Sequence, residues 1–172
     1  MMARTHVAFG AALALAAAQH DLIELTPLSF GACLVGTLLP DVDHPKSTFG
    51  KVIAPISTVV AAIVGHRGLT HSIWAVAACL AAILKPLPAF GGQPDAESVI
   101  LAALALGYVS HIIGDLLTVG GVPLFWPFPV RFRLPVLAFK TGGVVETGVL
   151  IALAGWVSFA LWRALQPALA TA

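Results

Sequence analysis

The chain has 172 residues, of which 59% are hydrophobic and only 10% are charged, and its mean hydropathy is +0.96. A soluble domain carries about 25% charged residues, so this composition excludes an ordinary water-soluble protein and predicts an integral membrane protein. The net charge of +1 gives no reason to expect a nucleic acid as a partner. The length predicts one domain over residues 1–172.

Apolar segments along the chain predict an all-α, polytopic helix bundle with about five spanning helices. The expected spans are residues 7–23, 28–39, 72–84, 99–117 and 144–165. Segment 28–39 is shorter than the roughly 20 residues of a span, so we expect it to tilt, to be partly buried in protein or to extend through its polar end. The run 52–65 is also short and contains Pro55, and we expect a re-entrant or interfacial segment there.

Residues between these segments predict where the helices begin and end. Pro27 marks the start of the next segment after the first helix. We expect the first helix to be retained rather than cleaved as a signal peptide. Ser98 is expected to cap the fourth helix. Residues 120–140 are rich in Pro, Phe and Trp, which predicts an aromatic interface segment rather than a regular helix. Cys33 and Cys79 lie inside apolar runs and are expected to pack in the core.

Positively charged residues distribute unequally across this topology. If the five helices cross and 52–65 does not, only Lys85 and Arg163 face one side. The other side holds seven, namely Arg4, Lys46, Lys51, Arg67, Arg131, Arg133 and Lys140. Because cytoplasmic loops carry the excess of Lys and Arg, this second side is predicted to be cytoplasmic, with the C-terminus outside.

Histidine and acidic residues gather on the same predicted cytoplasmic side. They are His6, Asp41, Asp43, His44, His66, His71, His111, Asp115 and Glu146. The predicted topology rests only on the apolar segments and on the Lys and Arg residues. The clustering of the acidic residues on one side is therefore a partly independent observation. Ionisable residues are rare and costly in so apolar a protein, and together these residues predict a metal site.

Residues 65–72, Gly-His-Arg-Gly-Leu-Thr-His-Ser, form the central motif of this predicted site. A single helix would hold His66 and His71 about 140° out of phase, whereas a loop that breaks into a helix near Thr70 could turn both toward one point. The alternative is a polar loop in which Thr70 or Ser72 caps the next helix.

Two further motifs carry potential ligands. His111 and Asp115 are four residues apart, so on a helix their side chains lie on one face and can bind one cation or bridge two. The alternative is a hydrogen-bonded helix pair. The Pro-bounded turn 40–45 offers Asp41, Asp43 and His44 for chelation, although it could equally be a solvated turn with Asp41 as a helix cap.

The remaining candidates each have a simpler alternative. His6 could rest at the membrane interface instead of binding metal. Glu146 begins the last helix, where the helix dipole favours a carboxylate in any case. Arg67 could bind a phosphate oxygen bidentately or only anchor the loop on the positive side. We predict Asp43, Arg67 and Glu146 as catalytic or supporting groups and the other members of the cluster as metal ligands.

Mixed imidazole and carboxylate ligands suit zinc most, with manganese or iron as alternatives, and several carboxylates could neutralise two or three divalent ions. Such a centre lowers the pKa of a bound water and holds the oxygens of a phosphoester during in-line attack. The chemistry predicted from the residues is therefore metal-dependent phosphoester hydrolysis.

The motifs resemble the YdjM-like family, described as LexA-binding, inner-membrane-associated metal-dependent hydrolases. The resemblance covers most of the chain and rests on Thr5-His6, residues 39–45 with Ser47 and Gly50, residues 66–72, residues 107–111 with Asp115 and Thr118, and Glu146. It implies a protein of the bacterial inner membrane with hydrolase activity, and it leaves the substrate undefined.

A more distant similarity links the chain to the zinc-dependent phospholipase C and P1 nuclease group, helical phosphodiesterases that bind three zinc ions. It consists of the ligand order His6, Asp41, a histidine of the 66–71 loop, His111 with Asp115, and Glu146. The chain departs from that group because residues 142–145 lack the histidine of its later HxxxE element. The chain therefore lacks one of the ligands that this group uses for its three zinc ions.

The sequence supports two functional hypotheses. The first is a membrane-embedded hydrolase of a lipid-like phosphoester at the cytoplasmic interface, beside the aromatic segment. The second is a non-enzymatic protein in which metal ions staple the helices or which binds a regulatory protein partner. An ion transporter ranks last, because the far halves of the helices contain mainly Ala, Leu, Val and Gly and offer no polar path.

Overall fold

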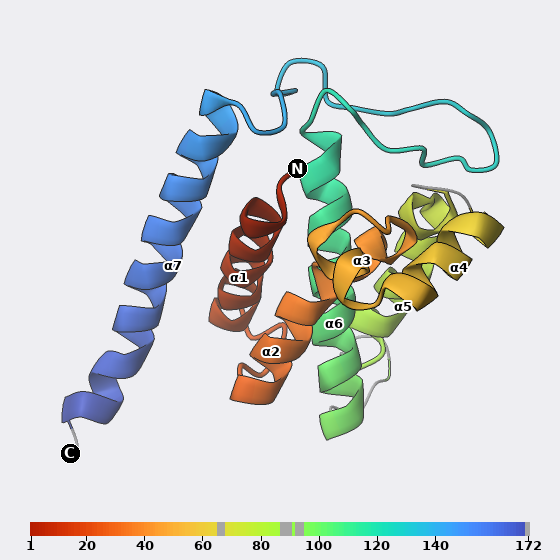
Figure 1. Ribbon diagram of the computed structural model, residues 1–172. Coiled ribbons are helices and arrows are strands. Elements are labelled where there is room, and N and C mark those ends of the chain that lie inside the picture. The colour runs from red at the N-terminus through yellow and green to blue at the C-terminus, as the bar shows by residue number, and fades with distance from the viewer. Residues whose placement is uncertain (65–67, 87–90, 92–94, 171–172) are drawn as a thin grey trace.

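The computed structural model describes residues 1–64, 68–86, 91 and 95–170 (Figure 1). Their helices are α1 (Ala3–Gln19), α2 (Pro27–Gly36), α3 (Thr48–Val52), α4 (Ala54–Val64), α5 (Ile73–Leu84), α6 (Ala96–Leu116) and α7 (Val144–Ala170). Two short 3-10 helices, η1 (Leu39–Asp43) and η2 (Leu69–His71), lie between them. Within the described residues there are no strands, which confirms the predicted all-α class.

Helix α6 is the central element of the bundle (Figure 1). It packs against α1, α2 and α5, and it also contacts η1 near its C-terminal end. The interior is built from small residues, including Ala14 and Ala103, which are both fully buried. Small residues allow close helix packing in a bilayer, where lipid is as apolar as leucine. Helix α7 packs on α1 at the side of this bundle.

Membrane-spanning length is present in two of the described helices. Helix α6 and residues Val144–Ala164 of α7 are each 21 residues long and apolar enough to cross a bilayer. Helices α1, α2 and α5 have only 17, 10 and 12 residues. At 1.5 Å per residue, α2 and α5 are about half the roughly 30 Å of a hydrocarbon core. The predicted five spans are therefore not confirmed.

The end of α1 differs from the prediction because of the turn that follows it. Asp21 adopts a left-handed conformation with φ of 55°. The Leu22 N–H donates to the Ala17 carbonyl at 2.9 Å and the Asp21 N–H to the Ala18 carbonyl at 3.2 Å. This paired arrangement is a Schellman cap. It ends α1 at Gln19, four residues before the predicted boundary.

Local capping sets the starts of α2 and α6. Thr26 and Ser29 form a reciprocal capping box, with Pro27 in the first turn of α2. Ser98 was predicted to cap α6, but the cap is Asp95, whose side chain accepts the Ser98 N–H at 2.8 Å. This hydrogen bond lowers the pKa of Asp95, because it stabilises the carboxylate. Helix α6 consequently begins at Ala96, three residues before the predicted boundary.

Residues 120–140 form the irregular connection that the sequence predicts, and we call it the aromatic segment. Two isolated backbone bridges, Thr118 with Phe139 and Val122 with Phe132, fold it over the C-terminal end of α6 (Figure 1). Phe125 and Phe128 are 50% and 67% exposed. Large aromatic side chains left outside the bundle fit a position at a membrane interface.

Two glycines let α2 and α6 touch through their backbones. A Cβ atom at Gly36 would lie 2.0 Å from the Leu104 carbonyl oxygen, and one at Gly107 would lie 1.9 Å from the Cys33 carbonyl oxygen. Both neighbours are backbone atoms, so a side chain cannot be accommodated without moving a helix. This close approach carries the end of α2 to the surface of α6 that bears His111.

We expect Gly107→Ala to lower the free energy of unfolding by about 1–3 kcal/mol, since overpacking a close contact strains the backbone. Gly31→Ala in α2 is the matched control, because a Cβ there meets nothing within 4 Å. Thermal unfolding in detergent would measure both. Equal transition temperatures for the two variants would contradict this account of the helix contact.

Candidate metal centre

The described residues contain a buried group of imidazoles and carboxylates where α6 meets the start of α1, η1 and η2. His6, His71, His111 and Asp115 are each at most 1% exposed. Histidine and aspartate are seldom buried this completely without a partner or a metal ion. Their neighbouring atoms therefore indicate what the cluster can bind.

His111 and Asp115 lie one turn apart on α6, as their spacing predicts. The His111 Nε2 atom is 3.9 Å from Asp115 Oδ2, while His111 Nδ1 is 2.7 Å from the Thr37 carbonyl oxygen. A carbonyl only accepts, so Nδ1 carries the proton and Nε2 presents its lone pair to the cluster.

The Thr37 carbonyl can serve His111 because the end of α2 leaves it without a helical donor. A 3-10 bond to this carbonyl would need an N–H at Pro40, which proline lacks, and α2 ends at Gly36, so its α-helical turns do not continue to Asp41. The last carbonyls of a helix lack partners within the helix and must find them elsewhere. The local sequence at the end of α2 thus creates the acceptor that fixes the His111 ring.

His71 is the last residue of η2 and points at the same aspartate from the other side. Its Nε2 atom is 4.0 Å from Asp115 Oδ2. Its Nδ1 atom is 3.0 Å from Thr70 Oγ1 and 3.7 Å from Asp43 Oδ2. A carboxylate behind one nitrogen favours the proton there, which leaves the other nitrogen as a ligand. Both His71 and His111 therefore have acceptors behind Nδ1.

Hydrogen bonds from two directions hold η2 in place. The Thr70 hydroxyl donates to Asp43 Oδ2 in η1, and the Tyr108 hydroxyl of α6 donates to the Thr70 carbonyl at 2.5 Å. Ser72, which follows η2, caps α5 by accepting the Ala75 N–H at 3.4 Å. The chain breaks into a helix near Thr70 as predicted, and the alternative role of Ser72 as a cap also holds.

The 3-10 geometry of η1 separates the two aspartates of the Pro-bounded turn. Residues two apart in such a helix are about 240° apart around its axis, so their side chains face different ways. Asp43 faces η2, whereas Asp41 Oδ1 lies 3.8 Å from His111 Nε2. The Asp41 side chain is 19% exposed, which makes it the most accessible potential ligand of the cluster.

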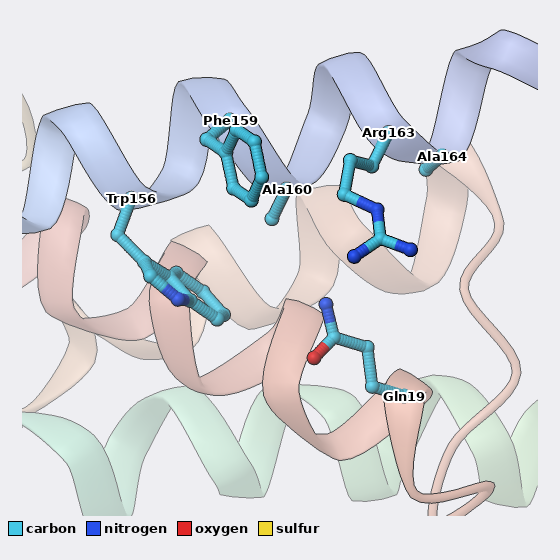
Figure 2. Close-up of a pocket in the computed structure, with 6 residues that line it drawn as sticks. All are labelled: Gln19, Trp156, Phe159, Ala160, Arg163 and Ala164. Atoms are coloured by element: carbon cyan, nitrogen blue, oxygen red, sulfur yellow. The ribbon is translucent and has the colours of Figure 1, made fainter.

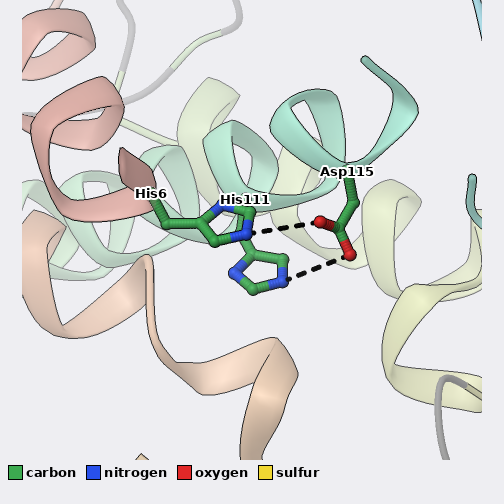
Figure 3. A group of neighbouring side chains, drawn as sticks. All are labelled: His6, His111 and Asp115. Carbon is green, nitrogen blue, oxygen red and sulfur yellow. Dashed lines mark ion pairs between the residues drawn. The ribbon is translucent and has the colours of Figure 1, made fainter. Parts of the chain in front are cut away.

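His6 reaches the cluster from the first turns of α1 (Figure 3). Its Nε2 atom is 3.3 Å from Asp115 Oδ1, and its ring stacks on His111 with centroids 3.7 Å apart. A Cβ at Gly114 would lie 3.2 Å from His6 Nδ1, so glycine gives His6 room beside α6. The Met1 amino group also donates to Asp115 Oδ1.

These residues form two overlapping groups of potential ligands. One contains His6, His111 and Asp115, the other contains Asp41, His71 and His111, and in each group the candidate atoms lie within 4.8 Å of one another. The Nε2 atoms of His71 and His111 are buried and make no hydrogen bond with any residue that the structure describes. An unsatisfied buried polar atom costs about 1–3 kcal/mol, a penalty that a bound cation would remove.

The spacing of the candidate atoms fits a small divalent ion. Around tetrahedral zinc, with bonds of about 2.0–2.1 Å, neighbouring ligand atoms lie about 3.4 Å apart. The distances from His111 Nε2 to Asp41 Oδ1 and Asp115 Oδ2 are 3.8 and 3.9 Å. Small side-chain rotations would close this difference. The donor set and its spacing therefore fit a divalent metal ion.

Three other predicted site residues are His44, His66 and Arg67. His66 and Arg67 fall outside the described residues. Among the described residues, His44 belongs to neither ligand group, and its backbone N–H closes η1 by donating to the Asp41 carbonyl at 3.0 Å. A ligand role for His44 stays a prediction.

Glu146 is fully buried but is engaged by backbone groups. Its Oε1 and Oε2 atoms accept the N–H groups of Met2 and Gly142, each at 2.6 Å. These bonds tie the start of α1 to the start of α7, and Glu146 belongs to neither ligand group among the described residues. Its catalytic role stays a prediction, and its visible role is to position the segment that carries His6.

The sequence did not reveal two supporting groups. Thr37 acts through its backbone carbonyl, which no side-chain pattern can mark, although Pro40 three residues later was an available signal. Tyr108 lies three residues before His111, nearly one turn of α6, and the chain contains no other tyrosine. A single polar aromatic residue inside an apolar helix could have been considered as a partner of the 65–72 motif.

Comparison with known proteins places the chain in a family. The family described as YdjM inner membrane protein matches residues 1–172. The inner membrane protein YdjM of Escherichia coli strain K12 is 41% identical over 165 residues, covering 91% of this chain and 81% of the relative. The uncharacterized protein YvsG of Bacillus subtilis strain 168 is 34% identical over 153 residues, covering 89% of each.

No solved structure matches the chain. The resemblance to the YdjM-like family is confirmed by these matches. The more distant similarity to the phospholipase C and P1 nuclease group is not confirmed.

We expect Asp43→Asn to weaken metal binding by about 10–100-fold, because groups behind a metal-bound imidazole orient it and raise its basicity. Titration of the metal-stripped protein with zinc would measure the change. Asp21→Asn, an exposed change in the turn after α1, is the control and should bind zinc as the wild type does. Unaltered affinity in Asp43→Asn would exclude the proposed support of His71.

Proposed function

The chain belongs to the YdjM family of membrane proteins, and from this premise we propose that it is a metal-dependent phosphoester hydrolase of the bacterial inner membrane. The proposed metal is zinc or manganese, held by His71, His111, Asp115 and Asp41, with His6 as a further ligand. The substrate is proposed to be lipid-like.

The observation that carries this proposal is the direction of the imidazole nitrogens. His71 and His111 both have acceptors behind Nδ1, and both turn toward Asp115 an Nε2 atom that makes no hydrogen bond within the described part of the chain. A hydrogen-bonded helix pair would explain His111 and Asp115 alone. It would not explain a second imidazole, from a different segment, that converges on the same carboxylate with the same orientation.

The residues around the centre support a hydrolytic role. A bound divalent ion would supply Lewis acidity and a water of lowered pKa. Asp115 and Asp41 place negative charge beside the imidazoles, which helps to hold a cation. Asp43 accepts the hydroxyl of Thr70, whose Oγ1 atom lies 3.0 Å from His71 Nδ1, and so supports the His71 ring through Thr70. Asp41 is partly exposed, so a substrate oxygen would approach the bound ion beside this carboxylate.

The lipid-like substrate class is supported by the aromatic segment. The Ile73 N–H, two residues after His71, donates to the Leu124 carbonyl of that segment at 2.7 Å. On the other side, the Leu134 N–H donates to the Leu116 carbonyl next to Asp115 at 2.9 Å. Backbone hydrogen bonds therefore hold the exposed aromatic side chains beside the turns that carry the ligands. The aromatic side chains could contact an acyl chain while the metal centre holds the headgroup.

A second candidate function is a non-enzymatic, metal-stapled membrane protein. The observation that favours it is burial, because the cluster leaves little surface open to a substrate. Its members also come from three separate segments, with His6 in α1, His71 in η2, and His111 and Asp115 in α6. An ion bound there would join α1, η2 and α6. This reading predicts stoichiometric metal without turnover.

Metal analysis of detergent-purified protein, followed by a panel of phospholipid and nucleotide phosphoesters, separates the two functions. We expect at least one zinc or manganese ion per chain and release of phosphate or a headgroup. Asp41→Asn should reduce turnover by about 100-fold or more, because it removes an accessible ligand of the catalytic ion. His20→Ala, at the exposed far end of α1, should retain full activity.

Protein that folds but carries no metal would contradict both candidate functions. Stoichiometric metal with no turnover on any substrate, combined with a lower unfolding temperature after chelation, would favour the staple and exclude the hydrolase.

The proposed site lies on the cytoplasmic side, as the charge distribution predicts. A C-terminal alkaline phosphatase fusion, which is active only outside the cytoplasm, should therefore be active in cells. The same fusion after Thr118, close to the metal centre, should be inactive. The opposite pattern would place the centre on the outer side of the membrane.

A further inference from the structure

A second potential binding site lies far from the metal centre, between the C-terminal parts of α1 and α7 (Figure 2). It is an open cavity of about 560 Å³ lined by Gln19, Trp156, Phe159, Ala160, Arg163 and Ala164. Gln19 is thirteen residues from His6 along α1, which corresponds to roughly 20 Å. This cavity, which we call the α1–α7 groove, is therefore separate from the proposed hydrolase centre.

The polar side chains of the groove present donors that the protein leaves unused. Figure 2 shows the Arg163 guanidinium extending from α7 toward the Gln19 amide of α1. Within the part of the chain that the structure describes, no hydrogen bond joins these two residues, and no carboxylate forms an ion pair with Arg163. A guanidinium offers only donors, in a fork that matches phosphate and carboxylate oxygens. The groove is therefore complementary to an anion.

The remaining walls of the groove are apolar. Trp156 and Phe159 are 39% and 54% exposed, and Ala160 is 5% exposed at the base. A small hydrophilic anion would gain no binding free energy from contact with these apolar side chains. A ligand with both an anionic group and a hydrocarbon chain would satisfy Arg163 and cover the aromatic rings at once.

The position of Arg163 along α7 identifies where such a ligand resides. Arg163 lies in the last turn of the candidate span Val144–Ala164, of which only 11% is buried within the protein. Arginine near the end of a span reaches the headgroup layer of the bilayer, and tryptophan is enriched at the same level. The groove is thus open toward lipid at headgroup depth.

We propose that the α1–α7 groove binds an anionic phospholipid. The Arg163 guanidinium and the Gln19 amide hold the headgroup phosphate, and one acyl chain lies along Trp156 and Phe159. The lipid fills the gap between α7 and the bundle, to which the described part of α7 is joined through α1.

Native mass spectrometry of the full-length protein, released from micelles with equimolar phosphatidylglycerol and phosphatidylcholine, tests this proposal. The wild type should retain phosphatidylglycerol preferentially. Arg163→Gln should reduce this preference about tenfold, as expected for the loss of a charged hydrogen bond. Arg163→Lys should fall between the two, because it keeps the charge but loses the forked geometry.

Lys140→Gln is the matched control, since it removes one exposed positive charge near the opposite end of α7. It should keep the wild-type preference. Unfolding temperatures and metal content, measured for every variant, should be unchanged, which separates lipid binding from folding and from the metal centre. A wild type without preference, an unaffected Arg163→Gln variant, or an equal loss in Lys140→Gln would each overturn the proposal.

Discussion

The hydrogen bond from His111 Nδ1 to the Thr37 carbonyl is the interaction on which the arrangement of the centre depends. It exists because Thr37, the residue that follows α2, lies three residues before Pro40, and because Gly36 and Gly107 let α2 and α6 approach through their backbones. It turns the His111 Nε2 lone pair toward Asp115 and Asp41. Shifting either helix by the width of a methyl group would break the bond and release the ring. The close packing of α2 on α6 therefore also fixes the orientation of the His111 ring in the cluster.

Burial explains why the cluster has so many supporting contacts. In an apolar surrounding each polar atom without a partner is costly, so the ring nitrogens facing away from the centre are matched with a carbonyl and a carboxylate. Among the described residues, no group forms a hydrogen bond with the Nε2 atoms of His71 and His111 that face inward, which is costly unless a cation binds them. The proposed hydrolase and the alternative metal staple both start from this feature. They differ in whether a substrate can reach Asp41.

Much of the fold could be predicted from composition and spacing, and the parts that could not are set by backbone geometry. The helical segments, the irregular aromatic segment and the shared face of His111 and Asp115 follow from apolar runs, proline content and i,i+4 spacing. The early end of α1 depends on the left-handed backbone of Asp21, which nothing in the pattern signals. The partners of Glu146 are backbone N–H groups from distant segments. The five predicted spans are not confirmed by the lengths of the described helices, because apolar composition does not show where capping ends a helix.

The most direct test of a metal centre built from imidazole and carboxylate ligands is X-ray absorption spectroscopy at the metal edge of the purified protein. The arrangement predicts nitrogen and oxygen neighbours at about 2.0–2.2 Å, with the multiple-scattering features of at least two imidazoles and no sulfur. In His111→Ala the imidazole contribution should fall. A sulfur ligand, which would require Cys33 or Cys79 to move, or the absence of any bound metal in folded protein, would contradict the account.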